Sequence, residues 1–227
     1  MNAAVARIGI MIEMHARDML RRHVALGLLL LLPLAFYLTS AGNGTSALPT
    51  GGTSIAFAVA GATVFSALSS AEVDQRLVMG GYRPIELLLG RLLFLGPLGL
   101  LLAAAFSTLM AAIAHPVRPE LLGFAVALVA VQSVPFGLAI AALVPRELEA
   151  TLILIGVVGI QLAVHTDTIV AKVLPFYGAR HLIDVSVTGH GAILIPVLAT
   201  VVYGLVLLVI ARVAIGPRLS VQQHALA

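Results

Sequence analysis

Long apolar stretches dominate this sequence, and they restrict it to helices that satisfy their own backbone hydrogen bonds inside lipid. Six stretches approach or exceed the ~20 residues that a helix needs to cross the hydrocarbon core. They lie near Val24–Ser40, Ser54–Ala71, Ile85–Ala114, Glu120–Val144, Ala150–Val170 and Gly191–Val213. Hydrophobic residues make up 60% of the 227 positions, which is more than soluble domains contain. The sequence therefore predicts an all-α membrane protein with six transmembrane helices in one domain, residues 1–227.

Basic residues near the helix ends predict the orientation, because lysine and arginine concentrate on the cytoplasmic side. If both termini are cytoplasmic, the inner side holds ten arginines: Arg7, Arg17, Arg21, Arg22, Arg76, Arg83, Arg91, Arg146, Arg212 and Arg218. The outer side then holds three basic residues, Arg118, Lys172 and Arg180. We therefore expect the N- and C-termini to lie inside the cell.

The N-terminal segment, residues 1–23, has the pattern of an amphipathic helix that lies along a membrane surface. One helical stripe is apolar: Val5, Ile8, Ile12, Ala16 and Met19. The charged residues lie mostly opposite: Arg7, Glu13, Arg17 and Arg21. Ile10 and Met14 interrupt the polar side, so an ordinary juxtamembrane tail remains the alternative to an interfacial helix.

The segment Ser69–Arg91 gathers six charged residues, although charged residues are only 10% of the chain. Ser69 or Ser70 is a possible N-cap, acidic residues come early, and arginine follows, which is the order that the helix dipole favours. Gly80-Gly81 would end this helix, and Pro84 is tolerated in the first turn of the next one. We expect a short, rigid helix within residues 72–84 that makes no contacts with the spans. Such a helix suits docking to another protein, whereas an ordinary solvated loop is the alternative.

Two segments are expected on the outer side. Ala41–Thr53 is rich in Gly, Ser and Thr and carries no charge, so it predicts a mobile loop. Residues 171–190 mix apolar, aromatic and charged residues, which is typical of a segment that dips into the membrane interface.

Taken together, these features resemble the permeases of ABC-2-type transporters. The resemblance rests on the N-terminal helix, the six spans, the charged segment with "LLLGR" after it, and "P-x-Y…ID" before the last span. It implies that Glu72, Asp74, Arg76, Gly80 and Pro84 belong to a coupling helix that inserts into an ATPase subunit. It also implies that Pro175, Tyr177 and Asp184, together with Leu182 and Ile183, belong to an external re-entrant segment that gates the path. One departure is that "EVDQRLVMGG" is shorter and poorer in Glu than the family's usual run.

The resemblance further implies an ATP-driven exporter in the bacterial plasma membrane. The chain's one lysine, Lys172, lacks the glycines of a phosphate-binding loop. We therefore expect no cofactor and no catalytic site on this chain, with ATP and Mg²⁺ bound by a separate ATP-binding subunit. The other expected partners are a second permease, identical or homologous, and membrane lipid; no nucleic acid is expected.

Polar and aromatic residues of the spans are the candidates for lining a substrate path: Phe57, Phe65, Gln132, Ser133 and Gln161. Hydrogen bonding between helices is the other role that suits the polar members. A path with few charges suits a hydrophobic or amphiphilic cargo such as a drug, lipid or lipopeptide. Ionisable residues lie only near the span ends, which makes an ATP-independent channel or secondary carrier the weaker alternative. A metal site among His165, Asp167, His181, Asp184 and His190 fits no standard ligand spacing.

Overall fold

The structure, a computed structural model, describes residues 3–21, 23–166 and 168–225, and that part of the chain contains helices and no strand. Ten α-helices and one 3₁₀-helix follow one another in these ranges: α1 (Ala3–Arg21), α2 (His23–Ser40), η1 (Ala41–Ala47), α3 (Leu48–Ser69), α4 (Ala71–Met79), α5 (Pro84–Ala114), α6 (Pro119–Leu143), α7 (Glu147–Ala163), α8 (Ile169–Val173), α9 (Tyr177–Thr188) and α10 (Leu194–Ala225). The predicted all-helical architecture is confirmed.

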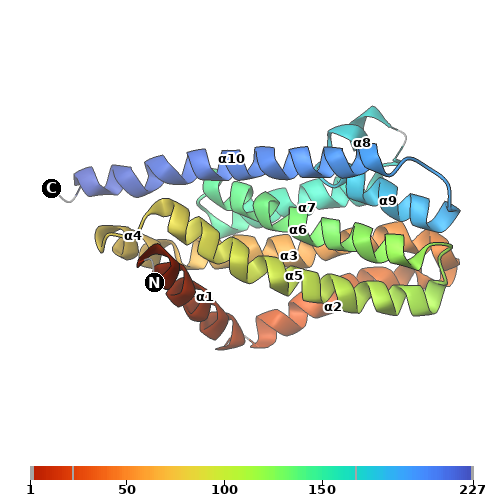
Figure 1. Cartoon of the computed structure of the whole chain (residues 1–227), viewed down its shortest axis with the longest axis horizontal. Coiled ribbons are helices and arrows are strands. Elements are labelled where there is room, and N and C mark those ends of the chain that lie inside the picture. The colour runs from red at the N-terminus through yellow and green to blue at the C-terminus, as the bar shows by residue number, and fades with distance from the viewer. Residues whose placement is uncertain (1–2, 22, 167, 226–227) are drawn as a thin grey trace.

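Four helical stretches of the described chain are long and apolar enough to cross a membrane: Leu31–Ser69, α5, α6 and Leu194–Ile215 of α10. The first stretch joins α2, η1 and α3, and it doubles back on itself at η1, so that α2 and α3 lie side by side (Figure 1). Gly44 interrupts the helical backbone there, with φ 62° and ψ −131°. The helix α7 has only 17 residues and is absent from the four. The chain is therefore a multi-pass membrane protein by its helices, whereas length and composition alone do not yield the six spans expected.

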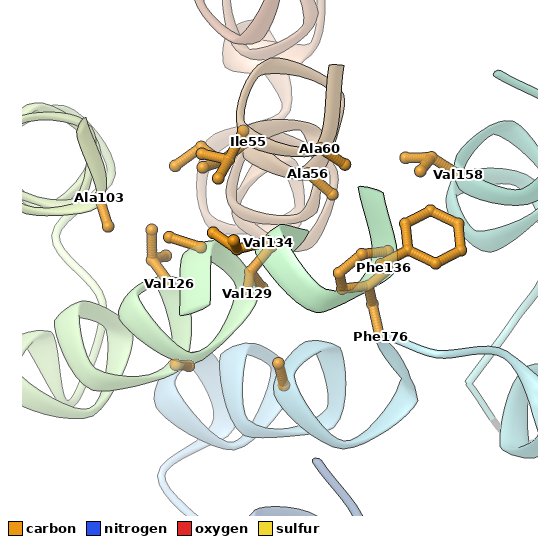
Figure 2. Close-up of a cluster of buried hydrophobic side chains, with 14 of the residues drawn as sticks. Ile55, Ala56, Ala60, Ala103, Val126, Val129, Val134, Phe136, Val158 and Phe176 are labelled. Carbon is orange, nitrogen blue, oxygen red and sulfur yellow. The ribbon is translucent and has the colours of Figure 1, made fainter. Parts of the chain in front are cut away.

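The central helix of the bundle is α6. In its most apolar window 78% of the residues are buried, whereas the corresponding share in α10 is 17%. Small side chains allow this burial: α6 packs closely on α3, and a Cβ on Gly137 would lie 2.7 Å from the carbonyl oxygen of Ala60. Figure 2 shows Val126, Val129 and neighbouring side chains of α6 facing α3. The outer helices therefore present their apolar side chains away from the core, as expected where lipid is the solvent.

The Gly-rich segment Ala41–Thr53 is not the mobile loop that its composition predicted. It forms η1 and the first turns of α3, and Gly51, Gly52 and Thr53 are buried. A Cβ on Gly51 would approach Tyr37 to 2.6 Å, and one on Gly52 would approach Ile183 equally closely. Gly51 and Gly52 therefore serve close helix packing, whereas Gly42 and Gly44 of η1 are exposed.

The connecting segments divide between the two ends of the bundle. Both chain termini lie at the same end as α4, while η1 and α9 lie at the opposite end (Figure 1). Arg76 on α4 and Arg146 before α7 belong to the first end, and Lys172 on α8 and Arg180 on α9 belong to the second. These four residues of the described chain thus divide between the two ends as the sequence analysis grouped them.

Candidate functional site

The short helix α4 forms the centre of the candidate site. It occupies Ala71–Met79, with Glu72 and Asp74 in the first turn and Arg76 in the last. It ends at Gly80, and Gly81 adopts a positive φ of 91°, a conformation that glycine adopts at little cost. Sequence order and helix dipole together explain why these nine residues fold as a helix.

Ser70, the residue before α4, does not cap it through its side chain. Its hydroxyl donates to the carbonyl oxygen of Ser66 at 2.6 Å and accepts from Arg91 Nη2 at 2.5 Å. The serine predicted as a cap therefore links the end of α3 to α5.

A buried ion pair fixes α4 to α5. Arg91 Nη2 lies 2.5 Å from Asp74 Oδ2, and the two residues are only 4% and 6% exposed. Burial raises the pKa of the Asp74 carboxyl, and the neighbouring Arg91 opposes this rise only in part. The expectation that α4 makes no contacts with the spans is therefore wrong, because Arg91 belongs to the long helix α5. Asp74, predicted as a partner contact, faces the interior of this chain.

The N-terminal helix holds the turn between α4 and α5. Arg7 Nη1 donates to the carbonyl oxygen of Gly81 at 2.8 Å and lies 3.6 Å from Glu86 Oε2. The guanidinium carbon also lies 5.3 Å from the ring centroid of Tyr82. Glu86 in turn accepts a hydrogen bond from the backbone N–H of Arg83 at 3.0 Å, which caps α5. One arginine of α1 thus contacts both sides of the turn.

Further along α1, the face toward α5 is built from residues four apart. Met11 is fully buried, and a Cβ on Gly90 would lie 2.8 Å from the Cβ of Met11. His15 is also buried, and its ring stacks near Phe94 with centroids 6.4 Å apart. The predicted stripe residues Ile8 and Ile12 are half-buried beside this face. Residues 1, 2 and 22 of the predicted segment 1–23 lie outside the described residues.

The outer surface of α4 combines charges with apolar side chains. Glu72 and Arg76 are exposed, as are Val73 (41%) and Met79 (58%). Gly80 is also exposed, whereas Pro84 is half-buried at the start of α5. Exposed apolar and charged side chains together on one short helix have the composition of a protein-docking surface.

Three of the residues considered for a substrate path lie in different surroundings. Phe57 stacks on Phe36, with ring centroids 5.4 Å apart, and Phe65 is 40% exposed. Ser133 is buried and donates to the carbonyl oxygen of Val129 on its own helix, at 2.6 Å.

Gln132 and Gln161 instead anchor the segment that precedes α9. Gln132 Nε2 donates to the carbonyl oxygen of Pro175 at 2.8 Å, and Gln161 Oε1 accepts from the backbone N–H of Phe176 at 3.3 Å. Both side chains are buried, at 2% and 0% exposure. Two polar side chains from different long helices thus hold adjacent backbone groups of one turn.

The predicted external segment, residues 171–190, folds as the end of α8, a turn and α9. Pro175 is buried, and Tyr177 lies near His181 with ring centroids 6.1 Å apart. Asp184 is half-buried one helical turn after Arg180. Since α9 has 12 residues, it is ~18 Å long and too short to cross the hydrocarbon.

Among the described residues, no three His, Asp or Glu side chains are placed to hold a metal ion; Asp167 of the proposed ligands lies outside them. Comparison with known proteins gives no relationship: no family model and no curated protein matches this chain.

Sequence reasoning missed Arg91 and Arg7 as structural partners of the α4 region. A signal for Arg91 was present, because a lone arginine eight residues into a long apolar helix needs a counter-charge nearby. For Arg7, the signal was its spacing of four from Met11 and of eight from His15, which places the three on one helical face.

Proposed function

We propose that this chain is the membrane-spanning permease subunit of an ABC-2-type transporter in the bacterial plasma membrane. Its cargo would be hydrophobic or amphiphilic and would be exported. The observation that carries the proposal is α4: a charged nine-residue helix between two long apolar helices, at the end of the bundle that holds both termini. The resemblance of the sequence to ABC-2-type permeases implies that the partner which docks on α4 is an ATP-binding subunit.

In this proposal the six spans are α2, α3, α5, α6, α7 and α10. The reversal at η1 supports counting α2 and α3 separately. The 17 residues of α7 extend ~26 Å, close to the ~30 Å thickness of the hydrocarbon core. An even number of crossings also agrees with termini at one end of the bundle. That end would face the cytoplasm, since it holds most of the arginines.

The buried Asp74–Arg91 pair would transmit movements of α4 to α5. A partner that pushes on α4 acts on α5 through Asp74–Arg91 and on α1 through the contact of Arg7 with Gly81. ATP and Mg²⁺ would bind to the partner, and Glu72, Arg76, Val73 and Met79 would contact it. Charged groups at such an interface set the register of docking.

A second permease subunit would complete the path, and the burial of the small residues supports one face for its binding over the other. The small residues Ala56 and Ala60 of α3 are fully buried within this chain. Around Gly156 and Gly159 of α7, by contrast, no atom from another part of the described chain lies within 4 Å of an added Cβ. Of the two faces that suggested dimerisation, α7 is therefore the one that remains open to a second subunit, identical or homologous.

The test is a charge swap on α4 that keeps the net charge. Glu72→Arg/Arg76→Glu should abolish retention of a P-loop ATPase by the purified chain, and ATP hydrolysis by the complex in liposomes should fall at least tenfold. This follows because a mispaired interfacial charge costs ~2–5 kcal/mol. The matched control is Arg146→Glu/Glu149→Arg, which reverses an exposed ion pair at the same end and should leave both readouts unchanged.

Unchanged retention and hydrolysis in the α4 variant would refute the docking role. An ATP-independent channel or carrier predicts this outcome, because its activity needs no contact at α4. Asp74 is left intact in this design, since its replacement would disturb the fold as well as the surface.

A further inference from the structure

Buried hydrogen-bond donors without acceptors gather where the end of α7 meets α9. Gln161 is fully buried, and its Nε2 has no hydrogen-bond partner among the described residues. The Nε and Nη1 atoms of Arg180 are likewise enclosed and unpartnered within that part of the chain. Within the described residues, Arg180 Nη2 donates to the carbonyl oxygen of Leu162 at 3.5 Å, which is the outer limit of a hydrogen bond.

These donors belong to one small region. Gln161 Oε1 accepts from the backbone N–H of Phe176, while Arg180 reaches the carbonyl of the adjacent Leu162. Phe176 and Arg180 are one helical turn apart, joined by the bond from Arg180 N to Phe176 O at 3.0 Å. The amide of Gln161 and the guanidinium of Arg180 thus extend across the same contact between α7 and α9.

Burying these hydrogen-bond donors without an acceptor costs free energy of folding. Burial lowers the pKa of Arg180, and the carboxylate of Asp184 opposes this only in part. A guanidinium does not lose its proton in proteins, so it stays charged and incompletely paired. Carboxylate and phosphate groups are the acceptors that match its planar set of N–H donors.

An apolar surface belongs to the segment that leads into this region, since α8 comes immediately before the turn that contains Phe176. The short helix α8 exposes Ile169 (80%), Val170 (55%) and Val173 (67%), with Lys172 also exposed. It stands out from the bundle beside α10 (Figure 1), and the hydroxyl of Tyr203 on α10 donates to the carbonyl oxygen of Val173. An apolar helix followed by an incompletely paired guanidinium and an amide donor is complementary to a molecule with an anionic head and an apolar chain.

We propose that the corner formed by the end of α7, α8 and α9 binds an anionic amphiphile. Its phosphate or carboxylate accepts hydrogen bonds from Arg180 and Gln161, and its chain lies against the apolar residues of α8. The headgroup takes the place of the Leu162 carbonyl oxygen as the acceptor for Arg180. Loss of that long contact makes the enclosed nitrogen atoms of Arg180 and Gln161 accessible to the headgroup. This site goes beyond the proposed transport function, since it requires no ATPase and no second subunit.

The test uses the full chain alone in detergent, with lipid binding measured by native mass spectrometry. Phosphatidylglycerol and phosphatidylcholine serve as anionic and zwitterionic probes, and inorganic phosphate serves as the free anion. Wild type should bind phosphatidylglycerol about tenfold more tightly than phosphatidylcholine, and Arg180→Gln should lose this preference, as expected for one charge-assisted hydrogen-bond group. Gln161→Glu should lose it too, because it keeps the acceptor for Phe176 N–H but replaces the donor nitrogen by oxygen.

Lys172→Gln is the matched control, because it removes one positive charge from the same corner while leaving the buried donors intact; its affinity should change less than threefold. Equal losses in Lys172→Gln and Arg180→Gln would overturn the proposal in favour of nonspecific surface charge. An unchanged preference in Arg180→Gln and Gln161→Glu would overturn it as well. Displacement of the lipid by millimolar phosphate would overturn the role of the apolar chain and identify a free anion as the ligand.

Discussion

Replacing either member of the Asp74–Arg91 pair should destabilise the protein, but with different dependence on pH. Asp74→Ala leaves the guanidinium of Arg91, 4% exposed, without its counter-charge. Because arginine keeps its proton, the cost is that of an unpaired buried charge, about 3–5 kcal/mol. For a chain of this size each kcal/mol corresponds to about 2–4 °C in Tm, so Tm should fall by about 6–20 °C at any pH between 5 and 8.

Arg91→Met leaves the buried Asp74 carboxyl without its counter-charge. This carboxyl can avoid the free-energy cost of an unpaired buried charge by taking up a proton. Burial already raises the pKa of Asp74 above its ordinary value, and removing Arg91 removes the charge that opposes this rise. A carboxyl whose folded pKa exceeds its unfolded pKa of about 3.9 loses stabilisation as pH rises through the folded pKa. The Tm deficit of Arg91→Met should therefore be smaller at pH 5 than at pH 8. Asp74→Leu/Arg91→Met, an apolar pair, should be less destabilised than either single variant.

Thermal unfolding in detergent, followed by circular dichroism at 222 nm, measures these differences in a chain that has no Trp. Arg146→Met is the control, since it breaks a surface pair with Glu149 whose side chains are 77% and 48% exposed and should cost less than ~1 kcal/mol. Wild-type Tm values in both single variants would show that the buried pair does not form. A pH-independent deficit in Arg91→Met would show that Asp74 is not the group that titrates.

Two further predictions concern packing and orientation. Gly178→Ala should lower Tm by an amount equivalent to about 1–3 kcal/mol, because the new Cβ would lie 2.2 Å from the carbonyl oxygen of Pro196. Gly156→Ala is the control and should leave Tm within experimental error, because no atom from another part of the described chain lies within 4 Å of its Cβ. Equal effects of the two substitutions would contradict the packing of α9 on α10. In this Cys-free chain, a cysteine introduced at Thr45 should react with an impermeant maleimide added outside the cells. A cysteine introduced at Glu72 should react only after permeabilisation. The reverse pattern would refute the prediction that both termini lie inside the cell.

Properties of short sequence segments, such as their hydropathy and the order of their charges, predicted much of the helical framework. Apolar stretches placed the long helices, since helix formation inside lipid depends on the residues within each segment. The order of Glu72, Asp74 and Arg76 predicted α4, because the effect of the helix dipole on charged side chains acts within the first and last turns. Such properties failed to predict the structure of Ala41–Thr53, where a Gly-rich composition fits both a mobile loop and a closely packed helix. Only the neighbours of Gly51 and Gly52 distinguish these two structures.

The sequence by itself determined that the chain is helical and apolar enough for a membrane, and that charges gather between two of its helices. Tertiary structure decided which charges face outward: Glu72 and Arg76 are exposed, whereas Asp74 turns inward to Arg91. It also decided that Gln161 holds the turn before α9. The physical reason is that helical periodicity specifies which residues share a face, but not what that face meets. Asp74 and Arg91 are 17 positions apart on different helices, and their pairing depends on how α4 folds back against α5.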